Sequence, residues 1–113
     1  MEKRHFMTGE VLFSEGEIGD EAYIIVKGEV VLSRGTDHSA YTKTIATLGE
    51  GDIVGEISLI SDQRHSVTAV AASDVETMVL TEAEFDTRMK ETDRVMRMIL
   101  KAFAKKLRST YNK

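Results

Sequence analysis

Residues 51–71 read Gly51-Asp-Ile-Val-Gly55-Glu56-Ile-Ser-Leu-Ile-Ser-Asp-Gln-Arg-His-Ser-Val-Thr-Ala-Val-Ala71, and this stretch decides the expected fold. It combines a strand end, a glycine, one turn of helix and a polar turn that leads into another strand. The first turn of a helix leaves backbone amides unpaired, and together with the helix dipole these amides attract anions. Gly55 would let the backbone approach a ligand closely, because it carries no side chain. The stretch is therefore predicted to hold an anion site.

Two charged residues qualify that prediction. A cation eight or nine residues after the glutamate can complete a clamp on a phosphate, and Arg64 lies eight residues after Glu56. A carboxylate in the same pocket would repel a phosphate. Glu56 is therefore predicted to bind a neutral hydroxyl group, and a sugar hydroxyl fits this role.

The chain on either side of this stretch has a β-rich first part. All eight glycines lie at or before residue 55, and proline is absent. Glycine marks tight turns, so the first half is predicted to be a turn-rich β structure. Strands are predicted at 10–13, 22–26, 29–33, 42–48, 66–72 and 76–80. The second and third of these strands are expected to pair as a hairpin across Lys27-Gly28. Short strands with regular turns indicate a roll or a barrel.

The last third is predicted to be helical. Thr81 and Glu84 fit a capping box at the start of a helix over 82–92. Asp93 is a suitable cap for a second, long helix that reaches Tyr111. One face of this helix is apolar and is interpreted as core or as a dimer seam; it consists of Met96, Ile99, Leu100, Phe103 and Leu107.

Composition excludes several classes of protein. There is no cysteine, so disulfide and thiolate chemistry are excluded. No apolar run is long enough to span a bilayer and no signal peptide is evident, so a cytoplasmic protein without a membrane partner is expected. A net charge of −4 argues against nucleic-acid binding by this chain alone. The basic residues between Lys101 and Lys113 are interpreted as favourable charge at the end of a helix.

Catalysis is not expected. His5, His38 and His65 are too far apart in the sequence for a metal site of the cupin type, and His5 and His38 are interpreted as surface residues. No nucleophile elbow, Walker loop or dinucleotide-binding glycine motif is present. The chain is therefore expected to be no enzyme and to need neither metal nor cofactor, which disfavours a cupin-type enzyme.

The stretch from Val54 to Ala69 resembles the phosphate-binding cassette of the cyclic-nucleotide-binding domain family, whose pattern is Phe-Gly-Glu-(Leu/Ile/Met)-Ala-Leu-Leu, a turn, and Pro-Arg-(Ala/Ser)-Ala-Thr-Val. This family includes catabolite activator proteins, protein kinase A regulatory subunits and cyclic-nucleotide-gated channels. Four further segments resemble the family in the right order, namely 9–16, 19–25, 26–30 and 48–52. The resemblance covers residues 9–108. It implies a mainly β fold, an antiparallel jelly-roll-like β-roll with a short cassette helix and two C-terminal helices. Residues 1–113 would form one such domain, with the roll over about 6–81 and the helices over about 82–111.

The resemblance also implies roles for individual residues. Backbone amides of Gly55, Ile57 and Ser58 would bind the cyclic phosphate or the ribose. Glu56 would accept a hydrogen bond from the ribose 2′-hydroxyl, and Ser66 would contact the phosphate or the base edge. The full predicted ligand-binding set is Gly55, Glu56, Ile57, Ser58, Arg64, His65, Ser66 and Val67.

The chain departs from the family at the phosphate-binding arginine. That arginine normally follows the glutamate by nine residues, and here the position is His65, with Arg64 one residue earlier. An ungapped register places His65 at the phosphate and keeps the downstream match. A one-residue deletion would place Arg64 there instead, but such a slip moves side chains to the opposite face of a strand. If His65 takes the role, nucleotide affinity is expected to rise as the pH falls through the histidine pKa.

The expected function is reversible binding of cyclic AMP or cyclic GMP, with cyclic AMP favoured, by a regulatory domain. Binding would reposition the C-terminal helix, which caps the base and could also form a homodimer. The chain would act alone or as part of a larger protein with an effector domain. The alternative is a degenerate β-roll that binds no nucleotide and serves in dimerisation or docking, because a fold does not determine a function.

Overall fold

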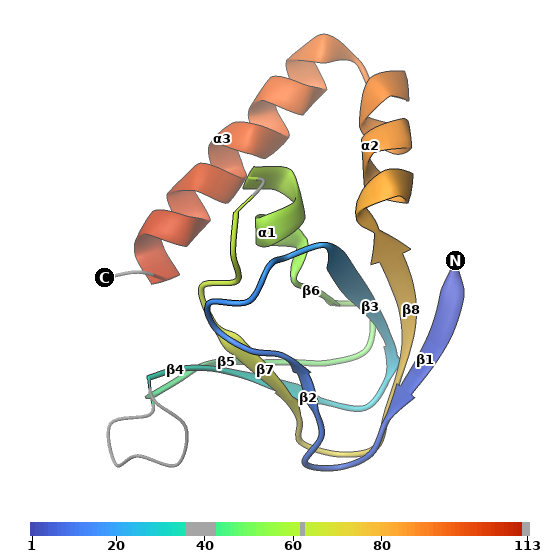
Figure 1. The fold of residues 1–113 in the computed structure, drawn as a ribbon, viewed down its shortest axis with the longest axis vertical. Helices are drawn as coiled ribbons and strands as arrows, with labels where there is room; N and C mark the ends of the chain where they lie inside the picture. The colour runs from blue at the N-terminus through green and yellow to red at the C-terminus, as the bar shows by residue number, and fades with distance from the viewer. Residues whose placement is uncertain (36–42, 62, 112–113) are drawn as a thin grey trace.

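The computed structural model describes residues 1–35, 43–61 and 63–111. These residues form β1 (Glu2–Phe6), β2 (Val11–Phe13), β3 (Glu21–Lys27), β4 (Val30–Arg34), β5 (Lys43–Leu48), β6 (Ile53–Val54), α1 (Glu56–Ser61), β7 (Thr68–Ala71), β8 (Val75–Thr81), α2 (Glu82–Glu91) and α3 (Arg94–Tyr111). In Figure 1 the strands form the lower part of the molecule, and α3 runs back past α1 from the far end of α2. The predicted mainly β fold with three helices is confirmed.

The strands form two antiparallel sheets with the orders β1-β8-β3-β6 and β2-β7-β4-β5. Side chains on a strand alternate between its two faces, and β8 shows this alternation. Val75, Thr77 and Val79 are buried, whereas Glu76 between them is exposed. The hydroxyl of Thr77 donates to the backbone oxygen of Arg4 at 2.8 Å, so this polar group is satisfied in the core.

The predicted hairpin between 22–26 and 29–33 is wrong. β3 pairs with β8 and β6, whereas β4 pairs with β5 and β7, so the two strands belong to different sheets. Gly28 joins them with a φ of +98°, and a Cβ at this position would lie 2.3 Å from the backbone oxygen of Asp74. Glycine therefore permits a tight passage from one sheet to the other. Two strands and a glycine form the same local pattern in both cases, so the pattern cannot identify the pairing partners.

The N-terminal residues extend the roll beyond its expected start. Glu2–Phe6 form the edge strand β1 and pair with β8, whereas the roll was expected to begin near residue 6. The strand is charged, and its Arg4 forms ion pairs with Glu2 and Glu21 at 2.9 Å each. Charged side chains are typical of an exposed sheet edge, and they hide the strand from a search for hydrophobic alternation. Residues 36–42, which include His38, lie outside the described residues.

Both helix starts agree with the sequence prediction. The hydroxyl of Thr81 accepts the backbone N–H of Glu84 at 3.2 Å, and it donates to the carboxylate of the same residue. The carboxylate of Asp93 accepts the N–H groups of Val95 at 3.0 Å and Met96 at 3.2 Å. α3 reaches Tyr111 as predicted.

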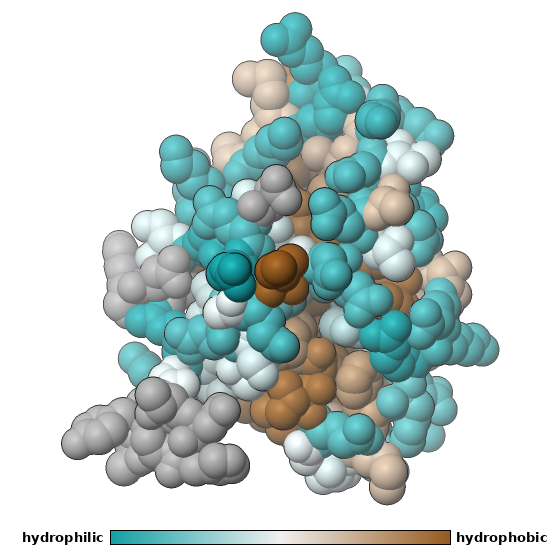
Figure 2. Space-filling view, in the orientation of Figure 1, coloured by the Kyte–Doolittle hydropathy of each residue, from teal (hydrophilic) through white to brown (hydrophobic). Residues whose placement is uncertain are grey.

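The apolar stripe of α3 does not belong to the core of this chain. Phe103 is 58% exposed, and Met96, Ile99 and Leu107 are also exposed, while Leu100 is half-buried. On the face shown in Figure 2 most side chains are hydrophilic, and hydrophobic ones gather over β2 in the lower half. In the described part of the chain no helix is long and apolar enough to cross a bilayer.

Candidate functional site

The turn from β6 into α1 is built on Gly55. Its φ is +84°, in the left-handed region that glycine adopts without strain. A Cβ here would lie 3.0 Å from the backbone oxygen of Glu21 and 3.2 Å from the ring of Phe13. The glycine is thus required by the packing of this turn against β2 and β3. Its close approach to a ligand, expected from the sequence, stays a prediction.

Seven of the eight predicted ligand-binding residues line one small cavity. They are Gly55, Glu56, Ile57, Ser58, His65, Ser66 and Val67, and the remaining walls come from Phe13, Leu32 and Leu48. The sequence prediction missed these last three residues, because they are apolar strand residues with no local mark of a ligand site. The cavity holds about 30 Å³, which suits one water molecule. Ligand pockets are typically about 300–1,000 Å³, so a nucleotide requires the lining side chains to move.

His65 forms one wall of this cavity and is only 6% exposed. Its backbone is fixed by bonds to the turn after β2, from its N–H to the oxygen of Glu17 at 2.9 Å and from the N–H of Gly16 to its oxygen at 2.8 Å. Its ring stacks on Phe13, with centroids 3.8 Å apart and planes at 13°. Its Nδ1 lies 3.0 Å from the hydroxyl of Ser58 on α1. The ring is therefore held on two sides.

Arg64 lies outside the cavity. Its side chain is exposed, and its guanidinium donates to the backbone oxygen of Gly16 at 2.9 Å. It lines a groove of about 430 Å³ beside the turn after β2, and this groove shares Phe13 and His65 with the cassette cavity. Of the two cationic candidates at the phosphate position, the fold thus places His65 in the cassette cavity and Arg64 on the outside. The described lining of the cavity contains neither lysine nor arginine.

Burial shifts the pKa values of the two titratable side chains of the cavity in opposite directions. Burial raises the pKa of Glu56, and a hydrogen bond from the backbone N–H of the same residue offsets only part of this rise. Burial lowers the pKa of His65, the nearby carboxylates of Glu17 and Asp20 oppose this shift, and the guanidinium of Arg108 adds to it. Both effects favour the uncharged side chain.

Arg108 of α3 connects the C-terminal helix to the cassette. Its guanidinium donates to the backbone oxygen of Arg64 at 2.8 Å and to the hydroxyl of Ser61 at 3.3 Å. One turn earlier, Ala104 is 2% exposed where α3 packs on α1. The sequence marked Arg108 only as one of several basic residues near a helix end. Its contacts depend on residues more than 40 positions away, so no local pattern could identify it.

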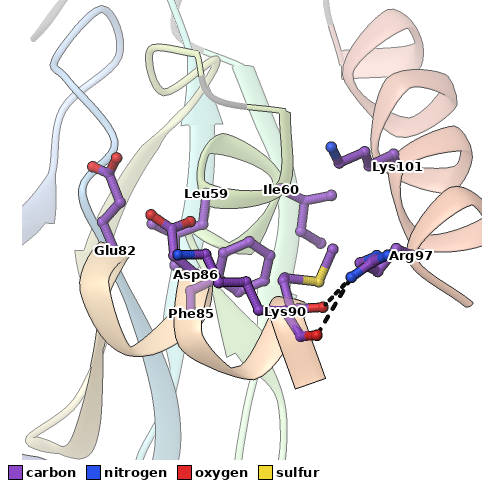
Figure 3. A pocket seen from close by; sticks show the side chains of 9 residues that line it. Leu59, Ile60, Glu82, Phe85, Asp86, Lys90, Arg97 and Lys101 are labelled. Carbon is purple, nitrogen blue, oxygen red and sulfur yellow. Dashed lines mark hydrogen bonds between the residues drawn. The ribbon is translucent and has the colours of Figure 1, made fainter. Parts of the chain in front are cut away.

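A larger groove of about 340 Å³ lies between the three helices, away from the cassette cavity. Figure 3 shows Leu59 and Ile60 of α1 on its floor, Glu82 and Asp86 of α2 on one side, and the basic side chains of α3 on the other. Arg97 donates to the backbone oxygen of Met89 at 3.1 Å and so joins α3 to the end of α2. The groove thus marks the junction of the helices and contains none of the predicted ligand-binding residues.

Comparison with known proteins identifies the family. The sequence profile described as cyclic nucleotide-binding domain matches residues 3–92 of this chain. The chain belongs to the cyclic nucleotide-binding domain family. The cyclic AMP receptor protein of Thermus thermophilus is 29% identical over 107 residues, which cover 95% of this chain and 49% of the relative. A cAMP-dependent protein kinase regulatory subunit of Dictyostelium discoideum is also 29% identical, over 91% of this chain and 32% of the relative. The chain thus spans half or less of the length of these curated relatives.

Solved structures of cyclic nucleotide-binding domain proteins agree in fold. The cAMP-bound form of the EAL enzyme Bd1971 has a TM-score of 0.85 at 33% identity, over 96% of this chain and 29% of that one. Its cGMP-bound form has a TM-score of 0.86 at 33% identity, over 95% of this chain and 28% of that one. A regulatory subunit of a cAMP-independent protein kinase A from Trypanosoma cruzi, bound to guanosine, has a TM-score of 0.68 at 28% identity, over 76% and 30%. The chain is thus a domain of the cyclic nucleotide-binding family with the β-roll fold.

Proposed function

We propose that this domain binds cyclic AMP at the cassette cavity and transmits binding through α3, without catalysis of its own. The observation that carries this proposal is the convergence of Gly55–Ser58 and of His65–Val67 on one cavity, from two segments of the cassette. Glu56 supplies the acceptor for a ribose hydroxyl, and its carboxylate has no hydrogen-bonding side-chain partner among residues 1–35, 43–61 and 63–111. The cAMP-bound relative at 33% identity supports the choice of ligand.

Thermal unfolding with added ligands tests this function. A ligand that binds the native state alone raises the midpoint in proportion to the logarithm of its concentration over Kd. Cyclic AMP is expected to raise the midpoint most, followed by cyclic GMP, with cyclic dinucleotides without effect. No shift with either cyclic mononucleotide at millimolar concentration would refute the proposal and favour the non-binding β-roll.

A purine nucleoside without phosphate is a second candidate ligand. The specific observation in its favour is the lining of the cavity. The family pattern has an arginine where this chain has the buried His65, and burial favours the uncharged form of this histidine. The relative from Trypanosoma cruzi is described as bound to guanosine. Adenosine and guanosine therefore belong in the same unfolding experiment. Stabilisation by a nucleoside at a lower concentration than by its cyclic nucleotide would select this candidate.

The route for the signal runs through Arg108. The cavity has to open for a nucleotide. This side chain bonds α3 to Ser61 and to Arg64, the residue before His65 in the cavity wall. Movement of the cassette on binding would therefore strain these bonds and shift the population of docked α3. Any effector domain in a longer chain would sense that movement.

Self-association through α3 completes the proposal. Met96, Leu100, Phe103 and Leu107 are spaced by four, three and four residues, which is the spacing of a coiled-coil seam. Three of the four are exposed in the single chain. Pairing with a second copy would bury them.

A further inference from the structure

The pair of Ser58 and His65 has a chemical consequence for the ligand site. Both side chains are buried, at 3% and 6% exposure, and the distance from the Ser58 hydroxyl to His65 Nδ1 is 3.0 Å. The stack on Phe13 fixes the plane of the imidazole, and the hydroxyl fixes its rotation in that plane. Only Nε2 of the ring is left for another partner.

The location of the proton follows from the hydrogen-bonding capacities of the two groups. A neutral imidazole has one N–H and one acceptor nitrogen, and a serine hydroxyl can donate or accept. Among the described residues the hydroxyl of Ser58 has no acceptor other than His65 Nδ1, and Nε2 has no partner. No buried side-chain nitrogen or oxygen of these residues lacks a partner, so Nε2 is not fully buried; His65 lines the cassette cavity and also the groove beside the turn after β2. Donation from Ser58 to Nδ1 then leaves the proton on Nε2.

We propose that Ser58 is a positioning residue that keeps His65 in the Nε2–H form, so that an uncharged imidazole donates a hydrogen bond to a phosphate oxygen of the ligand. This inference rests on the proposed function, because it requires a ligand with a phosphate in the cassette cavity. It assigns to the pair the role that a charged arginine has in the family pattern. With the opposite tautomer, Nε2 would present a lone pair to the anion and repel it.

The charges around the ring are compatible with a neutral donor. Glu17 and Asp20 act on His65 from the turn after β2, Arg108 acts from α3, and Glu56 lines the same cavity. Burial exceeds the effect of the two nearby carboxylates and lowers the pKa of His65. The ring is therefore neutral at pH 8, where its tautomer decides which nitrogen donates. At pH 5 a bound phosphate would favour the protonated ring, in which both nitrogens donate.

Nitrogen-15 NMR of the ligand-free chain tests the tautomer directly. At pH 8 the wild type is expected to show a protonated Nε2 and an unprotonated Nδ1 for His65. Ser58→Ala removes only the hydroxyl. In this variant the His65 ring is expected to be a mixture of both tautomers. A protonated Nδ1 in the wild type would overturn the inference, whatever the protein binds.

Calorimetry with cyclic AMP tests the consequence for binding. Ser58→Ala is expected to weaken binding about fivefold to tenfold at pH 8, the usual effect of one hydrogen bond, and about twofold at pH 5. A merely structural role of Ser58 predicts the same loss at both pH values, and that result would overturn the inference. If the wild type has the Nε2–H tautomer but binds no cyclic AMP, the proposed function and the donor role of His65 are refuted. The assignment of the tautomer would still stand.

Substitution of His65 supplies a matched pair. The side-chain amide of His65→Gln can place its N–H near the position of Nε2, whereas that of His65→Asn lies near Nδ1. The glutamine variant is expected to keep most of the affinity for cyclic AMP, and the asparagine variant to lose about tenfold. Equal losses in two variants with unchanged unfolding midpoints would contradict donation from Nε2.

Discussion

Glu56 is the proposed acceptor for a ribose hydroxyl, and its burial bears on the stability of the ligand-free fold. Its carboxylate is largely buried and has no side-chain partner in the described part of the chain, and burial raises its pKa. A carboxylate without a side-chain partner in the described residues is available to a ligand hydroxyl. Such groups reduce stability and are retained where function requires them.

Glu56→Gln is expected to separate these two effects. The pKa of Glu56 is raised in the folded state. The folded protein therefore loses stability as the pH rises above the ordinary glutamate pKa near 4.5. The variant should therefore raise the free energy of unfolding by about 1 kcal/mol at pH 7, and this gain should vanish at pH 4. Urea unfolding at both pH values measures it, with exposed Glu50→Gln as the control. Cyclic AMP affinity should fall by about tenfold.

Arg64 provides a contrasting test at the same scale. Its guanidinium is bonded to the backbone oxygen of Gly16 outside the cavity. Arg64→Ala is therefore expected to change the cyclic AMP affinity by less than about twofold, since an exposed charge contributes little. Titration calorimetry with cyclic AMP measures the affinity of the variant and of the wild type. A loss comparable with that of Glu56→Gln would mean that Arg64 swings into the pocket and binds the phosphate.

At the scale of elements, the contact between α3 and the cassette is the one most relevant to signalling. α3 packs against α1 and buries its Ala104, and Arg108 bonds to the turn that leads into His65. The proposed relay requires two states of this helix, docked and released. Ligand binding can shift their balance only if it favours one of them.

Arg108→Ala is expected to release this contact. The amides of residues 63–66 and of the end of α3 should exchange hydrogen faster, while those of β3 and β8 remain protected. Because the cavity must open for a nucleotide, loss of these bonds should raise the affinity for cyclic AMP about fivefold, which corresponds to about 1 kcal/mol. Lys105→Ala, at an exposed neighbour, is the control. A weaker affinity would show that docked α3 belongs to the bound state instead.

At the scale of the whole molecule, α3 carries an exposed apolar face. The side chains of Met96, Ile99, Phe103 and Leu107 are all more than 40% exposed and lie on one side of the helix. Exposed apolar stripes of this kind mark interaction surfaces. The seam spacing favours a second copy of the same helix.

Phe103→Glu is expected to abolish self-association without unfolding the chain, because the side chain is 58% exposed. Sedimentation velocity at tens of micromolar should show a dimer for the wild type and a monomer for the variant. Ala102→Glu adds the same charge next to the stripe and should leave the dimer intact. A monomeric wild type at these concentrations would exclude α3 as a dimer seam of this chain.

Several features could be predicted from the sequence because they depend on neighbours along the chain. Thr81 and Asp93 cap helices through amides two or three residues away. The ungapped reading of the cassette predicts His65 at the phosphate position, and the cavity lining contains His65 and not Arg64. Such interactions lie within one segment, so a pattern of residue types carries their whole description.

Only the tertiary structure decided the pairing of strands and the surroundings of the site. β3 and β4 follow one another in the chain yet belong to different sheets, in which β3 pairs with β8 and β4 pairs with β7. Phe13 under His65 and Arg108 on the cassette turn come from segments about 50 and 40 residues away. The physical reason is that these contacts depend on how distant segments pack around one core, which no single stretch of sequence specifies. The stretch from Gly51 to Ala71 thus determined the family and the pocket's location, and packing decided which side chains complete it.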